Sequence, residues 1–342
     1  MPDLTRENAV SGSATRTAGG AKALLEALDL RIGFARNGYS DELGLAVDGV
    51  GFSLERGKTL CLVGESGCGK SVTALSLLRL LPVPPARMLG GSIFFDGLDL
   101  AVLPEKELRR IRGGRIGMIF QDPMTSLNPV LRIGEQMGES LRLHRGVDAN
   151  QAIKAAADML ERVGIADGRA RTRDFPHQMS GGMRQRVMIG MAMLPNPELL
   201  IADEPTTALD VTVQKQILEL MRGLLENSGS ALLLITHNLG IVEQMADEVA
   251  IMYAGRIVEQ GSTGAILSAP SHPYTLGLLR SRPKNAQRKQ RLAAIPGTVP
   301  SLWERPGGCA FHPRCPKVHE KCRREPPPLV PAGSTLCRCW RR

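Results

Sequence analysis

The amino-acid sequence predicts an α/β protein whose core is a parallel β-sheet flanked by helices. Short, almost wholly apolar segments such as residues 59–63 and 231–235 are typical of strands that are buried on both faces. Between such segments, apolar residues recur with the spacing of amphipathic helices. Strands that alternate with helices along a chain form parallel sheets, so the order of the elements indicates the fold class.

The individual elements follow from local patterns. Loose alternation, apolar runs and bounding turn residues predict the strands, and a long stretch from about 133 to 163 has helical spacing. Strands are expected at 24–34, 90–97, 115–120, 199–202, 231–235 and 248–253. A second helix is predicted by an apolar stripe at Val213, Ile217, Leu220, Met221 and Leu224.

Composition divides the 342 residues into three parts. Residues 1–21 are polar and lack the apolar segment of a signal peptide, so we expect a disordered tail on a cytosolic protein. Residues 22–262 hold the alternating strands and helices. In residues 263–342 proline is frequent and periodicity fades, which predicts an irregular C-terminal extension. The chain contains no apolar run long enough to cross a bilayer.

The net charge of +9 is concentrated near the C-terminus. Residues 280–342 contain 15 Lys and Arg against 3 Asp and Glu, a balance of +12, and the remainder of the chain balances at −3. Nucleic acid, anionic lipid headgroups or an anionic group held inside the extension would each account for this excess. A simple solvated basic tail is the plainest alternative.

A glycine-rich loop joins the strand predicted at 59–63 to a helical segment that starts near residue 72. The loop is a complete G-x-x-x-x-G-K-S sequence, in which backbone N–H groups hold phosphate oxygens. We expect Lys70 to reach the β- and γ-phosphates of a nucleotide and Ser71 to place its hydroxyl on Mg²⁺. The loop residues are Gly64, Glu65, Ser66, Gly67, Cys68, Gly69, Lys70 and Ser71.

Further segments follow this loop in a fixed order. They are Gln121 at a strand end, the small-residue helix start at 179–186, the acids Asp203 and Glu204 after a buried strand, Asp210, and His237 after the next strand. Together with the loop, this set resembles the ATP-binding-cassette (ABC) ATPases over residues 22–262. The resemblance implies a P-loop ABC ATPase core, with a parallel-sheet RecA-like subdomain and a helical subdomain that carries the signature sequence at 179–186.

The resemblance implies the catalytic roles. Asp203 supports Mg²⁺, together with Ser71 and Gln121. Glu204 is the general base or water-positioning group for attack on the γ-phosphate. Gln121 senses Mg²⁺ and the γ-phosphate and relays their presence to a transmembrane partner, and His237 bonds the γ-phosphate.

Other residues are implied around the nucleotide. Phe34 is the candidate for stacking on adenine, with Tyr39 as the alternative aromatic residue. Residues of the signature sequence cap a nucleotide bound on the opposite subunit, so that two cassettes sandwich two ATP molecules. The nucleotide-binding set is completed by Ser180, Gly181, Gly182 and Asp210.

Two features narrow the resemblance. Met183 stands where the common signature has Gln, and this variant is similar to the D-type ATPase subunits of peptide and nickel importers. Segments 271–275, 295–300 and 308–316 look like the C-terminal extension of oligopeptide and dipeptide transporter ATPases. The resemblance therefore spans nearly all of residues 22–342.

The resemblance also implies partners and location. The expected partners are a second, different ATPase subunit, two transmembrane permease subunits and, indirectly, a solute-binding protein. The chain would lie on the cytoplasmic face of the inner (plasma) membrane. Segment 122–129, with Leu127 and Pro129 expected to be exposed, would contact a membrane subunit.

Five of the seven cysteines fall within the last 34 residues. Cys309, Cys315, Cys322 and Cys339 have the spacing C-x₅-C-x₆-C-x₁₆-C, and four thiolates in a cytosolic protein suit zinc or an iron–sulfur cluster. The resemblance favours a [4Fe–4S] cluster, with Cys337 as a spare that could replace Cys339. The +12 balance would offset the negative charge of such a site without nucleic acid. Unligated structural cysteines are the alternative.

The sequence thus predicts an ATP-hydrolysing cytosolic subunit that powers import of di- and oligopeptides. Nickel, glutathione or another small solute is the alternative cargo. A nucleic-acid-handling ABC ATPase is a rival, but the cassette contains no long heptad-bearing arm and the chain holds no second cassette. A regulatory module that binds ATP without turnover is disfavoured by the intact Lys70, Asp203 and Glu204.

Overall fold

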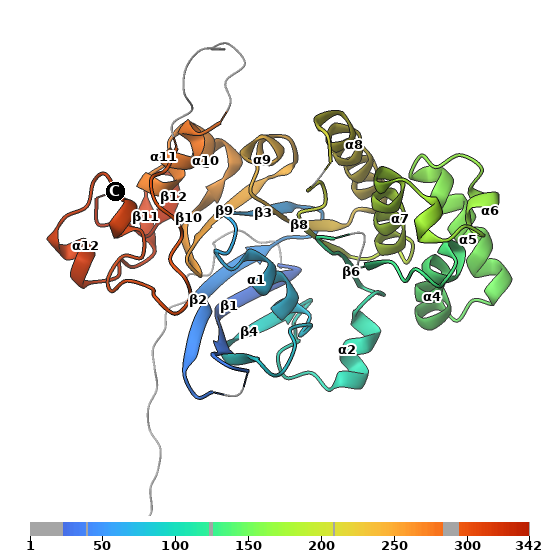
Figure 1. The fold of residues 1–342 in the computed structure, drawn as a ribbon, viewed down its shortest axis with the longest axis horizontal. Helices are drawn as coiled ribbons and strands as arrows, with labels where there is room; N and C mark the ends of the chain where they lie inside the picture. Colours follow the sequence, from blue (N-terminus) through green and yellow to red (C-terminus); the bar gives the residue numbers. More distant parts are fainter. Residues whose placement is uncertain (1–22, 39, 123–125, 208, 283–293, 342) are drawn as a thin grey trace, which may run out of the picture.

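The structure is a computed structural model that describes residues 23–38, 40–122, 126–207, 209–282 and 294–341. Three sets of residues named in the sequence analysis therefore lie outside the described part. They are the tail at 1–21, Tyr39, and residues 123–125 of segment 122–129. In this part of the chain the strands form an eight-stranded and a four-stranded sheet, with α4–α7 at one end of the molecule and α12 at the other (Figure 1).

The eight-stranded sheet has the order β11-β12-β10-β9-β3-β8-β7-β6, in which β11 is Val330–Ala332 and β12 is Thr335–Cys337. Strands β9, β3, β8, β7 and the edge strand β6 pair in parallel, whereas β10, β11 and β12 pair antiparallel. Both β7 and β8 are buried along their whole length, which confirms the prediction from their apolar runs. The main strands are β3 (Thr59–Val63), β6 (Ile116–Ile119), β7 (Leu199–Asp203), β8 (Ala231–Thr236), β9 (Glu248–Tyr253) and β10 (Arg256–Ser262).

The four-stranded antiparallel sheet has the order β2-β1-β4-β5. It consists of β1 (Leu25–Ala35), β2 (Leu43–Leu54), β4 (Ala86–Phe95) and β5 (Leu98–Asp99). The opening strand and the strand near residue 90 were predicted, whereas β2 was not. Its burial alternates only from Val50 to Leu54, and Gly44, Gly49 and Gly51 interrupt the strand, so most of it lacks the pattern of a half-buried strand.

The helices between 133 and 193 form a separate group. The long helical stretch predicted near 133–163 is in fact two helices, because Gly146 ends the first in the left-handed conformation (φ 65°) and Asp148 caps the second. The Asp148 carboxylate accepts a hydrogen bond from the Gln151 N–H at 2.9 Å. The group comprises α4 (Ile133–Arg145), α5 (Ala149–Arg162), α6 (Gly168–Arg171) and α7 (Gly181–Met193).

Among the remaining helices before residue 262, α1, α8 and α9 lie beside the sheets (Figure 1). The apolar stripe predicted from Val213 onward belongs to α8, whose Ile217, Met221 and Leu224 are buried. The remaining helices are α1 (Lys70–Leu77), α2 (Glu105–Ile111), α8 (Val211–Ser228) and α9 (Leu239–Met245). Among the described residues, no helix combines the length and apolar character needed to cross a membrane.

The C-terminal extension is mostly loops, but it also completes the main sheet. Strand β12 pairs with β10, and β11 pairs with β12. The buried Glu259 of β10 holds this junction, since its carboxylate accepts hydrogen bonds from Ser271 N–H (2.6 Å), His272 N–H (3.0 Å) and the Thr335 hydroxyl (3.1 Å). The extension comprises α10 (Thr263–Ser268), α11 (Pro273–Arg280), α12 (Glu320–Arg324), β11 (Val330–Ala332) and β12 (Thr335–Cys337).

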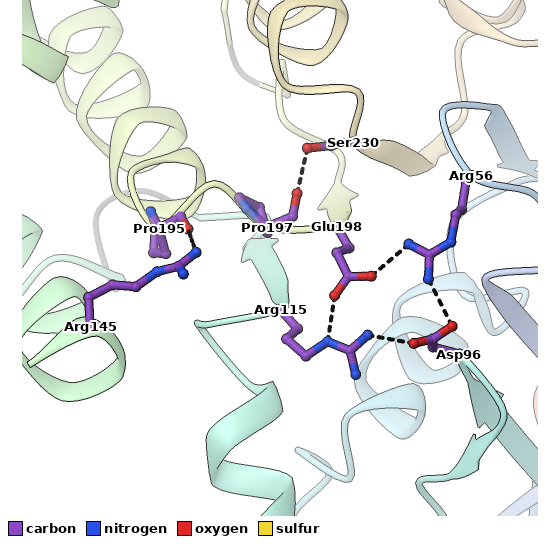
Figure 2. Close-up of polar contacts among 8 residues, drawn as sticks. All are labelled: Arg56, Asp96, Arg115, Arg145, Pro195, Pro197, Glu198 and Ser230. Atoms are coloured by element: carbon purple, nitrogen blue, oxygen red, sulfur yellow. Dashed lines mark hydrogen bonds and ion pairs between the residues drawn. The ribbon is translucent and has the colours of Figure 1, made fainter.

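A ring of four charges ties the two sheets together (Figure 2). Arg56 contacts Glu198 at 2.6 Å and Asp96 at 2.8 Å, and Arg115 contacts the same two carboxylates. Asp96 follows β4, whereas Glu198 and Arg115 precede β7 and β6. Because each carboxylate meets two guanidinium groups, the ring fixes the antiparallel sheet against the edge of the parallel sheet.

Candidate functional site

The glycine-rich loop leaves the carboxyl end of β3 and enters α1, as predicted. Gly67 and Gly69 have φ of 77° and 108°, which side chains rarely tolerate. A Cβ on Gly69 would also collide with the Ala46 carbonyl oxygen. The loop therefore needs glycine at these positions to wrap closely, as a phosphate-binding backbone requires.

The Lys70 ammonium is folded back onto the loop. Its side chain is buried, and Nζ donates to the Gly64 carbonyl at 2.8 Å and to the Glu65 carbonyl at 3.0 Å. These neutral acceptors hold a cation at the loop without cancelling its charge. Lys70 also lines the pocket in front of the loop, so its ammonium is placed to meet a phosphate there.

A pocket of about 350 Å³ opens in front of the loop. It brings together Lys70, Phe34 of β1, Gln121 after β6 and Glu204 after β7, as the sequence predicted. The other predicted residues that line it are Ser66, Gly67, Gly69 and Ser71. Gly64, Glu65 and Cys68 belong to the loop but are absent from the lining of this pocket in the described part.

Asp203 ends β7 beside the loop, close to Ser71. Burial raises the pKa of Asp203, and the repulsion of Glu204 adds to this effect, against the lowering by Ser71 and Lys70. Among the described residues, Asp203 Oδ1 is buried without a hydrogen-bond partner. An unpaired buried carboxylate oxygen next to a hydroxyl fits the donor set that Mg²⁺ prefers, so these residues fit the ion.

Glu204 is held in one defined position. It has a positive φ of 47°, its N–H donates to the Ile235 carbonyl at 3.0 Å, and its carboxylate accepts from the Thr207 hydroxyl at 2.7 Å. Burial alone would raise the pKa of Glu204, but the hydrogen bonds from Thr207 and His237 outweigh it and hold the pKa below its usual value. The side chain therefore stays ionised at neutral pH.

His237 lies against this carboxylate. Its Nδ1 is 3.2 Å from Glu204 Oε1, and its side chain is 54% exposed. Asn238 caps the following helix with its own side chain, donating no bond to the histidine. The contact with Glu204 is a feature that the sequence did not indicate.

The signature residues and Asp210 occupy helix starts away from the pocket. Ser180 caps α7, with its hydroxyl accepting from the Met183 N–H at 3.3 Å, and Asp210 caps α8 by accepting from the Val213 N–H at 2.9 Å. A Cβ on Gly181 would meet open space. Within the described part of the chain, Ser180, Gly181, Gly182 and Asp210 do not line the pocket.

The expected exposure of Leu127 is wrong. Its side chain is only 2% exposed and belongs to the same core as Ile133 and Met137 of α4. Pro129 is exposed, as predicted, and so are Val130 and Leu131. The apolar surface that follows Gln121 therefore begins two residues later than the sequence indicated.

The C-terminal extension supplies one wall of the pocket, which the sequence did not predict. Pro300, Ser301, Leu302 and Arg305 all line it. Arg305 Nη1 contacts Asp48 at 2.6 Å, and its Nη2 donates to the Leu45 carbonyl at 2.8 Å. A Cβ on Gly44 would overlap Leu302, so only glycine at that strand position lets the segment dock. No local pattern signals such a contact.

A second pocket gathers four of the predicted cysteines. Cys309, Cys315, Cys322 and Cys339 line it, whereas Cys337 is buried on β12 and outside its lining in the described part. Burial raises the pKa of Cys309 to about 11, and the neighbouring cysteine thiols add to this effect. Burial likewise raises the pKa of Cys315 and Cys339. None of the seven cysteines, all of which lie in the described part of the chain, forms a disulfide.

The cysteine pocket has the chemistry of a metal site but not its geometry. Among the described residues, no group of three or more His, Cys, Asp or Glu side chains is placed to hold a metal ion. The space among the thiols is about 10 Å³, which is smaller than a four-iron cluster. The four cysteines line one pocket, which would have to widen to enclose a cluster.

Comparisons with known proteins agree with these observations. A model of the ABC transporter family matches residues 47–207, and one of the oligopeptide/dipeptide transporter C-terminal region matches residues 258–322. The oligopeptide transport ATP-binding protein OppD of Bacillus subtilis is 49% identical over 91% of this chain and 87% of its own. The dipeptide transport ATP-binding protein DppD of Escherichia coli is 49% identical over 83% of this chain and 86% of its own.

Solved structures support the same fold. A dimeric ATP-binding cassette in a post-hydrolysis state, bound to ADP and Pi, aligns with a TM-score of 0.62 and 24% identity over 70% of this chain and 98% of its own. The structure of cbiO1 from Clostridium perfringens aligns with a TM-score of 0.60 over 72% of this chain and 91% of its own. The cassette fold that the sequence predicted is therefore confirmed. With relatives about half identical over more than four fifths of its length, the chain belongs to the ATP-binding subunits of the ABC transporter family that carry the oligopeptide/dipeptide transporter C-terminal region, and it is an ATPase.

Proposed function

We propose that this chain powers the import of di- and oligopeptides through a membrane transporter. One observation supports ATP hydrolysis by this chain. Lys70, Ser71, Gln121 and Glu204 line one pocket, with Asp203 close to Ser71. The peptide cargo rests on the relatives that are named for oligopeptide and dipeptide transport and on the match of the C-terminal region. Nickel, glutathione or another small solute is the alternative cargo.

In the proposed reaction, the loop N–H groups and Lys70 hold the β- and γ-phosphates. Glu204 accepts a proton from, or orients, the water that attacks the γ-phosphorus. Ser71, Gln121 and Asp203 would hold Mg²⁺, which supplies neutralising charge to the phosphate oxygens. Phe34 stacks on the adenine, and residues 22–262 form the nucleotide-binding domain that performs these steps.

We further propose that two cassettes form the complete site. Ser180, Gly181 and Gly182 are exposed or open at the start of α7, and Asp210 lies at the start of α8, so all four are available to a facing subunit. The partners would be a second ATPase subunit and two permeases on the cytoplasmic face of the inner membrane. Val130 and Leu131, 75% and 43% exposed, are the apolar candidates for contact with a permease.

Because the complete site needs two cassettes, we expect the isolated chain to be a slow ATPase. We expect Ser180→Ala to lower turnover by the assembled transporter while leaving ATP binding by the isolated chain unchanged, because the hydroxyl acts on the partner's nucleotide. The change also removes a helix cap, at a cost of about 1 kcal/mol. Ser262→Ala removes the matching cap of α10 far from the site and is the control. Full turnover by the isolated chain would contradict this prediction.

A nucleic-acid function is not favoured by the basic extension. Arg314 is paired with Glu65, Arg305 with Asp48, and Arg338 Nε donates to the Ile257 carbonyl at 2.9 Å. These three arginines thus bind partners within the chain, whereas binding to nucleic acid would need them free to contact its phosphates. Salt-dependent binding to DNA, measured beside ATPase activity, distinguishes the two functions.

For the cysteine pocket, we propose that Cys309, Cys315, Cys322 and Cys339 hold a [4Fe–4S] cluster that staples the loops of the extension. Their convergence on one pocket supports this proposal, and a zinc ion is the alternative. Anaerobically purified protein is expected to be brown, with stoichiometric iron and sulfide. Cys322→Ser should abolish the colour, whereas Cys337→Ser should retain it. Colourless protein with one zinc per chain would refute the cluster.

A further inference from the structure

Arg314 of the C-terminal extension forms an ion pair with Glu65 of the phosphate-binding loop. Its Nη1 lies 2.7 Å from Glu65 Oε2, and its Nη2 donates to Glu65 Oε1 at 3.1 Å. The pair is bidentate and joins residues 249 positions apart. The Arg314 side chain is only 6% exposed, so this is no ordinary surface ion pair.

The guanidinium is itself fixed from several sides. Its Nε donates to the Pro296 carbonyl at 2.8 Å, and it lies 5.7 Å from the centre of the Tyr253 ring and 6.0 Å from that of Phe311. A planar guanidinium held in this way has little freedom left to lose when it binds a carboxylate. Arg314 therefore acts as a rigid support for Glu65.

The extension also holds the backbone of Glu65. The Glu65 N–H donates to the Tyr274 hydroxyl at 3.0 Å, while the Glu65 carbonyl accepts from Lys70 Nζ at 3.0 Å. Two of these three restraints on Glu65, from Arg314 and Tyr274, come from the extension. Glu65 lies five residues before Lys70, so its position sets the path of the loop around the incoming phosphates.

We propose that Arg314 is a positioning residue for nucleotide binding. It clamps Glu65 and so keeps the loop in the shape that accepts phosphates, which makes ATP affinity depend on the C-terminal extension. The proposal rests on the proposed role of the loop as the ATP site. Arg314 also precedes Cys315, so the clamp stands at the border of the cysteine pocket.

The test is ATP affinity of the full chain with Mg²⁺, measured at equilibrium under conditions without turnover. Arg314→Gln is expected to weaken ATP binding by about 5- to 20-fold, within the usual range of coupling between sites. Glu65→Gln should weaken it similarly, and adding Arg314→Gln to it should have no further effect, because Arg314 acts through Glu65. Arg314→Lys retains the charge and should restore part of the affinity.

The control is Arg324→Gln, which breaks the exposed ion pair of Arg324 with Glu320 in the same extension and should leave ATP affinity unchanged. If Arg314→Gln alone fails to fold, the double variant remains informative, because it leaves no unpaired charge. Additive losses in the double variant, or unchanged affinity in folded Arg314→Gln protein, would overturn the proposal. Absence of ATP binding by the unmodified chain would instead overturn the ATP site itself.

Discussion

Replacing Glu204 with glutamine is expected to lower ATP turnover by about 10²- to 10⁴-fold while ATP still binds. The carboxylate lines the nucleotide pocket, and Thr207 and His237 hold it in place and keep its pKa low. Glutamine keeps the shape and removes the proton acceptor. The substitution should therefore slow the chemical step and spare the steps before it.

The measurement is steady-state phosphate release by the assembled transporter, together with ATP affinity. Glu219→Gln makes the same chemical change at an exposed position of α8 and should leave both quantities unchanged. The glutamine variant should accumulate bound ATP, since the nucleotide enters but is not cleaved. Phosphate release near that of the unmodified protein would remove Glu204 from its proposed role.

Replacing Asp203 with asparagine is expected to have two opposite effects. Mg²⁺-dependent ATP affinity should fall by about 10- to 100-fold, the usual cost of losing a group that supports a bound metal. The ligand-free protein should instead become more stable, because Asp203 Oδ1 is buried without a partner among the described residues and its pKa is raised. A functional group that destabilises its own fold is typical of a binding site kept ready for a cation.

The stability difference should depend on pH. A raised pKa means that folding favours the protonated acid, so the destabilising charge is absent below the ordinary aspartate range and grows as pH rises through the folded value. Thermal unfolding of the ligand-free chain at several pH values measures this difference. Asp158→Asn, at an exposed position of α5, is the control. Lower stability of Asp203→Asn at neutral pH, with unchanged Mg²⁺-dependent affinity, would contradict both effects.

The parallel core could be predicted because its strands are recognisable from the local sequence alone. Strands β7 and β8 are continuous apolar runs, and both are buried throughout. The residues that directly follow such strands meet at one edge of the sheet, which is why Gln121, Glu204 and the loop before Lys70 line one pocket. The sequence assigned them to one site through the resemblance to ABC ATPases. In these places local sequence and fold agree.

Prediction failed where the decisive contacts were not local. Strand β2 is supported by its neighbours rather than by alternation, and Leu127 is buried because α4 packs over it. Segment 300–305 lines the nucleotide pocket because Arg305 meets Asp48, 257 residues away in the sequence, and because Leu302 packs against Gly44. Neither hydrophobic periodicity nor turn chemistry encodes such a pairing.

The sequence by itself determined the chemical groups of this protein: the glycines that permit a tight phosphate loop, Lys70 within it, the acids Asp203 and Glu204 after a buried strand, and four cysteines near one end. Only the tertiary structure decided how these groups are combined. In the folded chain, Cys339 lines the cysteine pocket and Cys337 does not, because β12 pairs with β10 and buries Cys337 in the sheet. The tertiary structure also brought Arg314 onto Glu65. Backbone preferences act over a few residues, whereas sheet pairing and buried ion pairs join distant segments, so their outcome depends on the whole folded chain.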